Sequence, residues 1–184
     1  MGDLKLLEDL YEKNWIDEWY ENKTQKEKYR KKGRELLKKF YDYTIAHAPN
    51  PKYLEQSFYL PIGNYHFTGK IDRADQKDGG VEIIDYKTSE KIPAKNEKND
   101  LDQLMVYQWA AQESLGEKVT GLCYWYLQDN KFLPEATATP GQIDELKHRL
   151  LKSIEKIIHT TQYDLFSEVD GGLKNHDCKF RHLE

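Results

Sequence analysis

The chain has 184 residues, 38% hydrophobic and 33% charged, and its 28 Lys and Arg stand against 32 Asp and Glu for a formal net charge of −4. No segment approaches the roughly 18 consecutive apolar residues of a membrane-spanning helix, and the acidic balance excludes a protein that holds duplex DNA by bulk positive charge alone. The 4 Trp, 13 Tyr and 6 Phe supply large apolar surfaces for a core, which indicates a globular protein rather than a disordered one.

The cysteines and the chain ends bear on location and domain organisation. Cys123 and Cys178 form no C-x-x-C pair, which excludes a zinc ribbon and argues against a disulfide framework. The N-terminus has no apolar signal region, so we expect a cytoplasmic, reduced protein. At this length we expect one domain over residues 1–184. Both ends are abrupt, which indicates a domain excised from a longer protein.

Two helices are predicted before the first strand. Apolar side chains, among them Leu10 and Trp19, recur at helical spacing over residues 4–21. A second helix is predicted over residues 24–46, because Asn50-Pro51 stops the pattern soon afterwards.

Short β-rich runs follow, separated by turn residues, and predict a three-strand meander over 53–60, 65–73 and 81–87. A polar loop then leads to a helix over 101–115 that is apolar nearly all round, which is typical of a buried helix. Strands over 119–128 and 131–136 come next, so the order predicts an α/β domain with a mixed sheet flanked by helices. The expected parts are N-terminal helices (1–48), a catalytic sheet with its central helix (53–136), a C-terminal helix (140–160) and a tail (161–184).

Three polar residues of the meander indicate a catalytic site. Asp85 and Lys87 are two residues apart on a predicted strand, so their side chains share one face and Tyr86 takes the other. Asp72 lies near the end of the preceding strand, and a hairpin brings strand ends together. Two carboxylates suit Mg²⁺ or Mn²⁺, and a lysine beside such an ion can orient an attacking water whose pKa the ion lowers.

The alternative for these residues is a surface ion pair, since an Asp-x-Lys pair on a strand is common and contributes under about 1 kcal/mol. The apolar run Ile83-Ile84 directly before Asp85 favours a buried carboxylate instead. A buried carboxylate needs a partner.

Three segments carry a resemblance to a known family: Gly69-x-Ile71-Asp72-Arg73-x-Asp75, Ile83-Ile84-Asp85-Tyr86-Lys87-Thr88 and Asp102-Gln103-Leu104-x-x-Tyr107. In this order they resemble the RecB-like nuclease domains of the PD-(D/E)XK superfamily, over roughly residues 30–182. The versions fused to the C-terminal end of UvrD-type helicases are the most similar, and AddB-type exonuclease domains are also similar. The resemblance implies a restriction-endonuclease-like core.

The resemblance also implies roles for single residues. Asp72 and Asp85 match the two acidic metal ligands, Lys87 matches the catalytic lysine, and the backbone carbonyl of Tyr86 would complete the metal shell. Glu55 stands where relatives often have a glutamate that faces the site; the alternative is a surface acid on an edge strand.

Gln103 and Tyr107 match the Q-x-x-x-Y helix motif of the same family, and their i, i+4 spacing puts them on one helix face. In the functional interpretation they bind substrate: Gln103 contacts the active site or the DNA backbone, and Tyr107 lines the groove. The alternative is a buried helix with two satisfied polar groups.

The chain departs from the family in two places. Relatives carry a histidine on a helix upstream of the meander, whereas His47 lies in a loop-like Ala-His-Ala-Pro segment. Many relatives hold a [4Fe-4S] cluster with four cysteines, and here only Cys178 matches that tail. With two cysteines in all, no Fe-S cluster can form on this chain.

Residues 26–39 hold eight Lys and Arg against two Glu. This segment either tracks nucleic-acid phosphates or is a solvated helix face, and the sequence alone favours the solvated face.

Together these features predict a Mg²⁺- or Mn²⁺-dependent deoxyribonuclease. The resemblance implies an exonuclease on single-stranded DNA that works with a helicase motor, in cis or in trans, in repair or recombination. No membrane partner is expected. The alternative is a catalytically incomplete nucleic-acid-binding or docking module of a helicase, which the missing upstream histidine favours and the set Asp72, Asp85 and Lys87 argues against.

Overall fold

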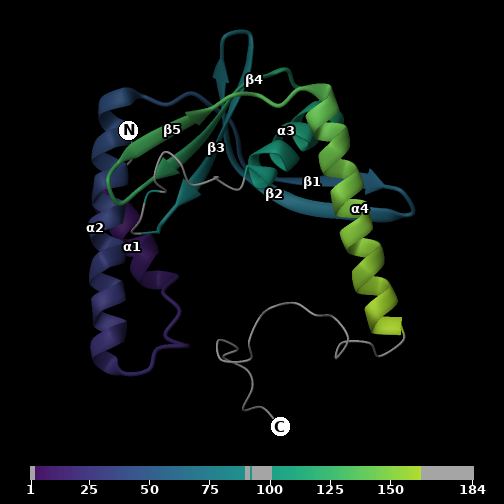
Figure 1. The fold of residues 1–184 in the computed structure, drawn as a ribbon. Helices are drawn as coiled ribbons and strands as arrows, with labels where there is room; N and C mark the ends of the chain where they lie inside the picture. Colours follow the sequence, from purple (N-terminus) through teal and green to yellow (C-terminus); the bar gives the residue numbers. More distant parts are fainter. Residues whose placement is uncertain (1–2, 90–91, 93–100, 163–184) are drawn as a thin grey trace. The chain divides into compact units, whose positions relative to one another are not determined.

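The structure is a computed structural model that describes residues 3–89, 92 and 101–162 (Figure 1). Its elements in chain order are α1 (Leu4–Lys13), α2 (Lys23–His47), β1 (Pro51–Ile62), β2 (Tyr65–Lys77), β3 (Gly80–Lys87), α3 (Asp102–Ser114), β4 (Val119–Tyr126), β5 (Lys131–Glu135) and α4 (Pro140–Gln162). The chain divides into two compact units, Met1–Ile143 and Asp144–Glu184. The sheet and its candidate site lie in the first unit.

The five strands form one mixed sheet in the order β1-β2-β3-β4-β5. The meander β1-β2-β3 is antiparallel, β3 and β4 are parallel, and β5 returns antiparallel to β4. A parallel pair needs a crossover connection, and here the segment between β3 and β4 contains α3. The predicted α/β class, with a meander, a helix and a strand pair, is confirmed.

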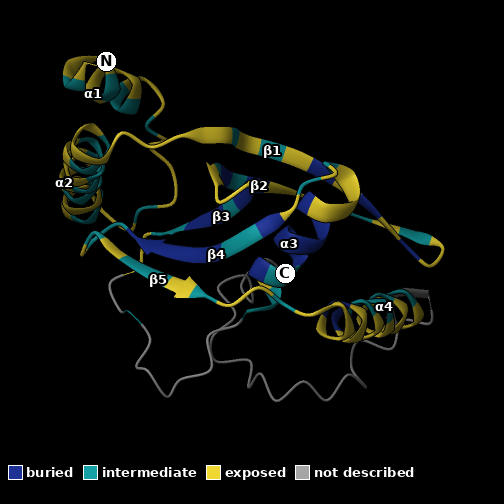
Figure 2. Ribbon diagram, turned by 90° about the horizontal axis from the view of Figure 1, so that it is seen from above, coloured by how far each residue is buried: buried dark blue, intermediate teal, exposed yellow. Residues whose placement is uncertain are grey.

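The core sits on the central strands and on α3 (Figure 2). Trp125 and Leu122 of β4 and Trp109 of α3 are at most 2% exposed. The buried α3 agrees with its apolar sequence, since a helix that is hydrophobic all round has no face for water. In the ranges that the structure describes, no helix is long and apolar enough to cross a membrane.

An aromatic layer joins α2 to one face of β3, β4 and β5. Phe40 and Tyr43 of α2 lie 5.2 and 5.0 Å from the ring of Trp125, and Phe132 stacks on Trp125 at 4.6 Å. Cys123 lies in the same buried cluster, where burial raises the pKa of its thiol to about 12. Cys123 is therefore a core residue.

The first helix is shorter than predicted. The periodicity predicted a helix over 4–21, but α1 ends at Lys13, where Asn14 caps it by donating its side-chain amide to Leu10 O at 2.7 Å. Beyond it, Trp15 stacks on Tyr20 at 5.7 Å across a reversal of the chain, whereas Trp19 is 87% exposed. The apolar residues do recur at helical spacing, but beyond Lys13 Trp15 and Tyr20 take part in tertiary packing rather than in a helix.

Helix α1 lies close against α2 because Gly33 leaves room for it. A Cβ atom at Gly33 would come within 2.0 Å of the Tyr11 hydroxyl, which donates to Arg30 O at 3.1 Å. Glycine in a helix interior costs about 1 kcal/mol relative to alanine, and this close approach explains its use.

Candidate active site

The β2-β3 ladder ends where the candidate carboxylates begin. Arg73 and Ile84 are the last paired residues, so Asp72 and Asp85 stand one step beyond the ladder. There the Asp72 side chain replaces a main-chain partner, since Tyr86 N donates to Asp72 Oδ2 at 3.0 Å. The opening of the two strands thus fixes one carboxylate on the backbone of the neighbouring strand.

Asp85 is a buried carboxylate, as the apolar run before it predicted. The residue is 2% exposed, and its Oδ2 lies 2.7 Å from Lys87 Nζ. The side chain of Asp85 is 3% exposed and that of Lys87 is 31% exposed. Burial raises the pKa of Asp85 and the charge of Asp72 adds to the rise, while Lys87 opposes it. Asp85 Oδ2 is buried, and the Lys87 ammonium is its ion-pair partner.

Lys87 is held from a second side by α3. Gln103 Oε1 accepts from Lys87 Nζ at 2.6 Å, and Gln103 Nε2 donates to the Tyr107 hydroxyl at 3.0 Å. Because an ammonium can only donate, it fixes which end of the Gln103 amide faces it. The ammonium also lies 4.8 Å from the ring centre of Tyr124 on β4. The structure therefore brings Asp85, Lys87, Gln103 and Tyr107 into one chain of contacts.

The pKa of the Tyr107 hydroxyl depends on the acidic residues near it. Burial raises the pKa of its hydroxyl, and the charges of Asp85, Asp72 and Glu55 raise it further, in that order. The three candidate carboxylates therefore all lie close enough to Tyr107 for their charges to act on its hydroxyl.

Glu55 lies farther out. In the β1-β2 register Leu54 faces Arg73 and Gln56 faces Ile71, so Glu55 lies across from Asp72. Its backbone is left-handed, with φ of 49°, and its side chain is 66% exposed and pairs with Lys70 at 3.4 Å. A left-handed conformation costs a non-glycine residue about 1–2 kcal/mol, which makes Glu55 a distorted position within a long regular strand.

The residues fit a divalent cation in part. Within the described residues no three His, Cys, Asp or Glu gather closely enough to hold a metal ion. The charge of Asp72 raises the pKa of Asp85, so the two carboxylates are close enough to interact, and Lys87 is the ion-pair partner of Asp85. Carboxylate oxygens are ligands that a hard cation prefers. Main-chain oxygen, such as the Tyr86 carbonyl, would add to this ligand set.

The buried ion pair between Arg73 and Asp75 was not predicted, although both residues belong to the first of the three motifs that resemble the family. Arg73 is 5% exposed and its Nε donates to Asp75 Oδ1 at 2.6 Å, with a second bond from Nη2 to Asp75 Oδ2. Its Nη1 donates to the Tyr86 hydroxyl at 3.4 Å. Burial works against the charge, but the bonds to Asp75 and Tyr86 hold the pKa of Arg73 above its ordinary value. The spacing Arg73-x-Asp75 on one strand face was the available signal.

Two other sequence expectations concern residues away from this centre. His47 is the last residue of α2 rather than a loop residue, because the helix runs on until Ala48 caps it in a left-handed conformation. Its ring stacks on Tyr43 at 3.9 Å. Cys178 lies outside the described residues, as does most of the predicted loop over 88–100.

Comparison with known proteins identifies the family to which the chain belongs. The sequence matches the PD-(D/E)XK nuclease superfamily over residues 3–183, and the chain therefore belongs to that superfamily. Membership implies a nuclease, that is, a hydrolase that binds DNA and uses divalent metal ions. No curated protein matches the chain. Among solved structures, the crystal structure of SSO0001 is 13% identical with a TM-score of 0.40, covering 81% of this chain and 83% of its own.

Proposed function

We propose that this protein is a Mg²⁺- or Mn²⁺-dependent deoxyribonuclease in which Asp72, Asp85 and Lys87 carry out phosphodiester hydrolysis. The observation that supports it best is the contact chain Asp85–Lys87–Gln103–Tyr107 beside Asp72. A surface ion pair would leave Asp85 exposed, whereas its side chain is 3% exposed. Burial of an acid with a second carboxylate near it is costly unless positive charge stabilises it.

The residues divide the work. Asp72 and Asp85, with the Tyr86 carbonyl and Glu55 as an outer candidate, would hold the cation, which when bound supplies activation of water and neutralisation of phosphate charge. The Lys87 ammonium orients the attacking water and donates to the phosphoryl oxygen on which charge develops. Gln103 keeps that ammonium in place, and Tyr107 keeps Gln103 in place.

We propose further that the substrate is single-stranded DNA attacked from an end, in repair or recombination beside a helicase motor. This rests on the resemblance of the three motifs to RecB-like domains of UvrD-type helicases. The test is cleavage of end-labelled single-stranded, duplex and circular single-stranded DNA with Mn²⁺. We expect the linear single strand to shorten stepwise from an end and the circle to persist. A cut circle would contradict end-dependent attack, and a product ladder from internal cuts would do the same.

Gln103→Ala is expected to slow cleavage about 10- to 100-fold with little change in KM, because a misplaced catalytic group costs rate rather than binding. The loss should appear in kcat measured at saturating DNA. Gln112→Ala is the matched control, since Gln112 is an exposed glutamine on the same helix. A Gln103→Ala enzyme with the kcat of the control would show that Lys87 needs no positioning from α3.

One observation favours the alternative of a catalytically incomplete docking module, namely that no three potential ligands gather in the described residues. Metal binding separates the two. A nuclease with a functional site should be stabilised by Mn²⁺, by about 2.7 kcal/mol at a hundredfold excess over Kd. This amounts to roughly 5–10 °C in melting temperature for a protein of this size.

Asp85→Ala should abolish that shift, whereas Asp42→Ala, an exposed acid on α2, should keep it. The measurement is thermal unfolding with and without Mn²⁺. Equal melting temperatures of the unaltered protein in both conditions would favour the docking module.

A further inference from the structure

Helix α2 carries basic residues on two different sides, and those on the side of α1 pair with acids of the protein itself. Towards α1, Arg30 and Arg34 both pair with Glu12, the latter at 2.6 Å. Lys26 pairs with Asp17 at 3.0 Å on the same side. These pairs account for three of the eight basic residues that the sequence gathers over 26–39. They join the two helices and leave little charge for a ligand.

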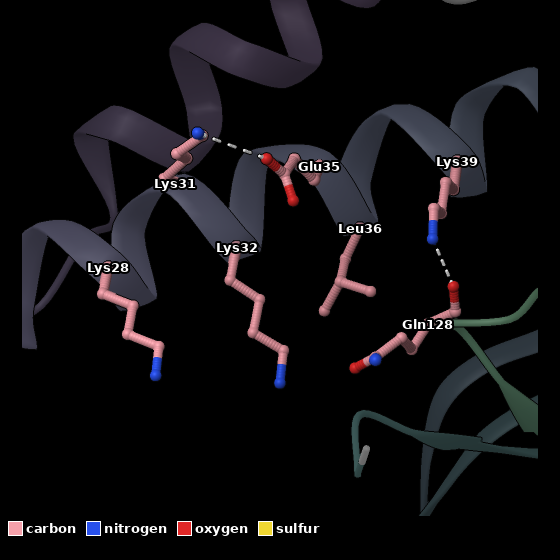
Figure 3. Close-up of a pocket in the computed structure, with 7 residues that line it drawn as sticks. All are labelled: Lys28, Lys31, Lys32, Glu35, Leu36, Lys39 and Gln128. Carbon is pink, nitrogen blue, oxygen red and sulfur yellow. Dashed lines mark hydrogen bonds and ion pairs between the residues drawn. The ribbon is translucent and has the colours of Figure 1, made fainter. Parts of the chain in front are cut away.

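The other side of α2 faces a pocket of about 360 Å³ (Figure 3). It is lined by Lys28, Lys31, Lys32, Glu35, Leu36, Lys39 and Gln128. Lys28, Lys32 and Leu36 follow one another at four-residue spacing, and Lys39 lies three residues further, so they form one stripe along the helix. Figure 3 shows Lys28 and Lys32 extending side by side into the open space, while Lys31 turns away towards Glu35, 4.0 Å from it.

The opposite wall of this pocket belongs to the end of the sheet that bears the candidate site. Lys39 Nζ donates to the main-chain oxygen of Gln128, which follows β4. In β3 and β4, Lys87 pairs with Tyr126, and Leu127 N donates to Lys87 O at 3.0 Å. Gln128 is thus the residue next to the one bonded to the main chain of Lys87. Its side-chain Oε1 is buried and, within the described residues, has no hydrogen-bond partner.

We propose that this stripe, Lys28, Lys32 and Lys39 with Gln128, is a binding groove for the phosphate backbone of a single DNA strand that leads to the end of β3. The inference deepens the proposed nuclease function and rests on it. Three ammonium groups provide charge complementary to a polyanion, and the Gln128 amide can turn its NH₂ group to a phosphate oxygen. Lys28 and Lys32 are about 6 Å apart along the helix axis, a spacing that lets them contact successive phosphates. Glu35 at the rim restricts the track to the Lys28–Lys32 side.

The test is the affinity for a fluorescein-labelled single-stranded DNA oligonucleotide, measured by anisotropy in EDTA over a range of salt concentrations. In EDTA there is no cleavage, so binding is measured independently of catalysis. Lys28→Gln with Lys32→Gln should flatten the slope of log K against log salt by about 1.4, since each single-strand phosphate contact contributes about 0.7. For two proteins with equal affinity at 1 M salt, this change in slope makes the affinity of the double variant about 60-fold weaker at about 50 mM salt.

Lys23→Gln with Lys38→Gln is the matched control, because both lie on α2 outside the pocket and the change in charge is the same. Equal slopes and affinities in the two double variants would overturn the groove, and so would a lack of binding by the unaltered protein. Lys28→Glu with Lys32→Glu gives a second version with a larger expected loss, and melting temperatures confirm that each variant is folded. Binding in EDTA tests the groove, whereas cleavage with Mn²⁺ tests the nuclease, so failure of the groove is distinguishable from failure of the nuclease.

Discussion

Replacing Lys87 with alanine is expected to lower the rate of DNA cleavage about 10²- to 10³-fold. The estimate follows from the loss of one donor aimed at the charge that develops on the phosphoryl group. Its reason in this molecule is that Lys87 Nζ lies 2.7 Å from Asp85 Oδ2 and donates to Gln103, which holds the ammonium beside the candidate carboxylates. The measurement is single-turnover cleavage of labelled single-stranded DNA with Mn²⁺.

Lys77→Ala serves as the control for this prediction. Lys77 is also a strand lysine in an ion pair, 2.7 Å from Glu82, but half of its side chain is exposed. We expect its cleavage rate to match that of the unaltered protein. Equal residual cleavage by Lys87→Ala and the unaltered protein would point to a contaminating nuclease and would remove Lys87 from the mechanism.

Asp75→Ala should have the largest effect on stability, lowering the free energy of unfolding by about 3–5 kcal/mol. The reason is that it leaves the Arg73 guanidinium, whose side chain is 7% exposed, without its carboxylate partner. Arg73 would keep the 3.4 Å bond to the Tyr86 hydroxyl and the ring of Trp125, 5.7 Å from its Cζ. Urea denaturation monitored by tryptophan fluorescence measures the change.

Two variants make this result specific. Arg73→Met with Asp75→Leu should recover most of the lost stability, because replacing both members of a buried pair with apolar residues is often neutral. Asp42→Ala breaks the exposed pair of Asp42 with Lys38, and we expect little change. A double variant as unstable as Asp75→Ala would mean that the buried pair is not what the single change disrupts.

The fold was predictable because its signals are local. Alternation marked the strands and continuous apolarity marked α3, and the ends differ from prediction by only a few residues in each case. Asp72, Asp85 and Lys87 could be predicted to lie together from the sequence. The alternation of a strand determines which face each side chain takes, and a hairpin brings the ends of its two strands together. The hydrogen bond from Lys87 to Gln103 depends on the packing of α3, which no local sequence pattern specifies.

The failures share a cause. Residues 14–21 continue the apolar spacing of a helix, yet Trp15 and Tyr20 stack across a reversal of the chain. Whether aromatic side chains extend a helix or fold back on it depends on what lies opposite, here α2 with Gly33 beneath Tyr11. The left-handed backbone of Glu55 was likewise unpredictable, because nothing in its neighbours demands it.

The alternation of β3 has a consequence for which changes this protein can tolerate. Ile84 and Tyr86 lie in the aromatic layer against α2, while Asp85 and Lys87 lie towards α3. The position of each residue along β3 therefore determines on which of the two sides its side chain lies. A single residue inserted between Ile84 and Asp85 would shift the phase of the strand, carrying the ammonium into the hydrophobic layer and the Tyr86 ring into the acidic centre. Substitutions in β3 alter one side at a time, whereas a change in its length would exchange the two.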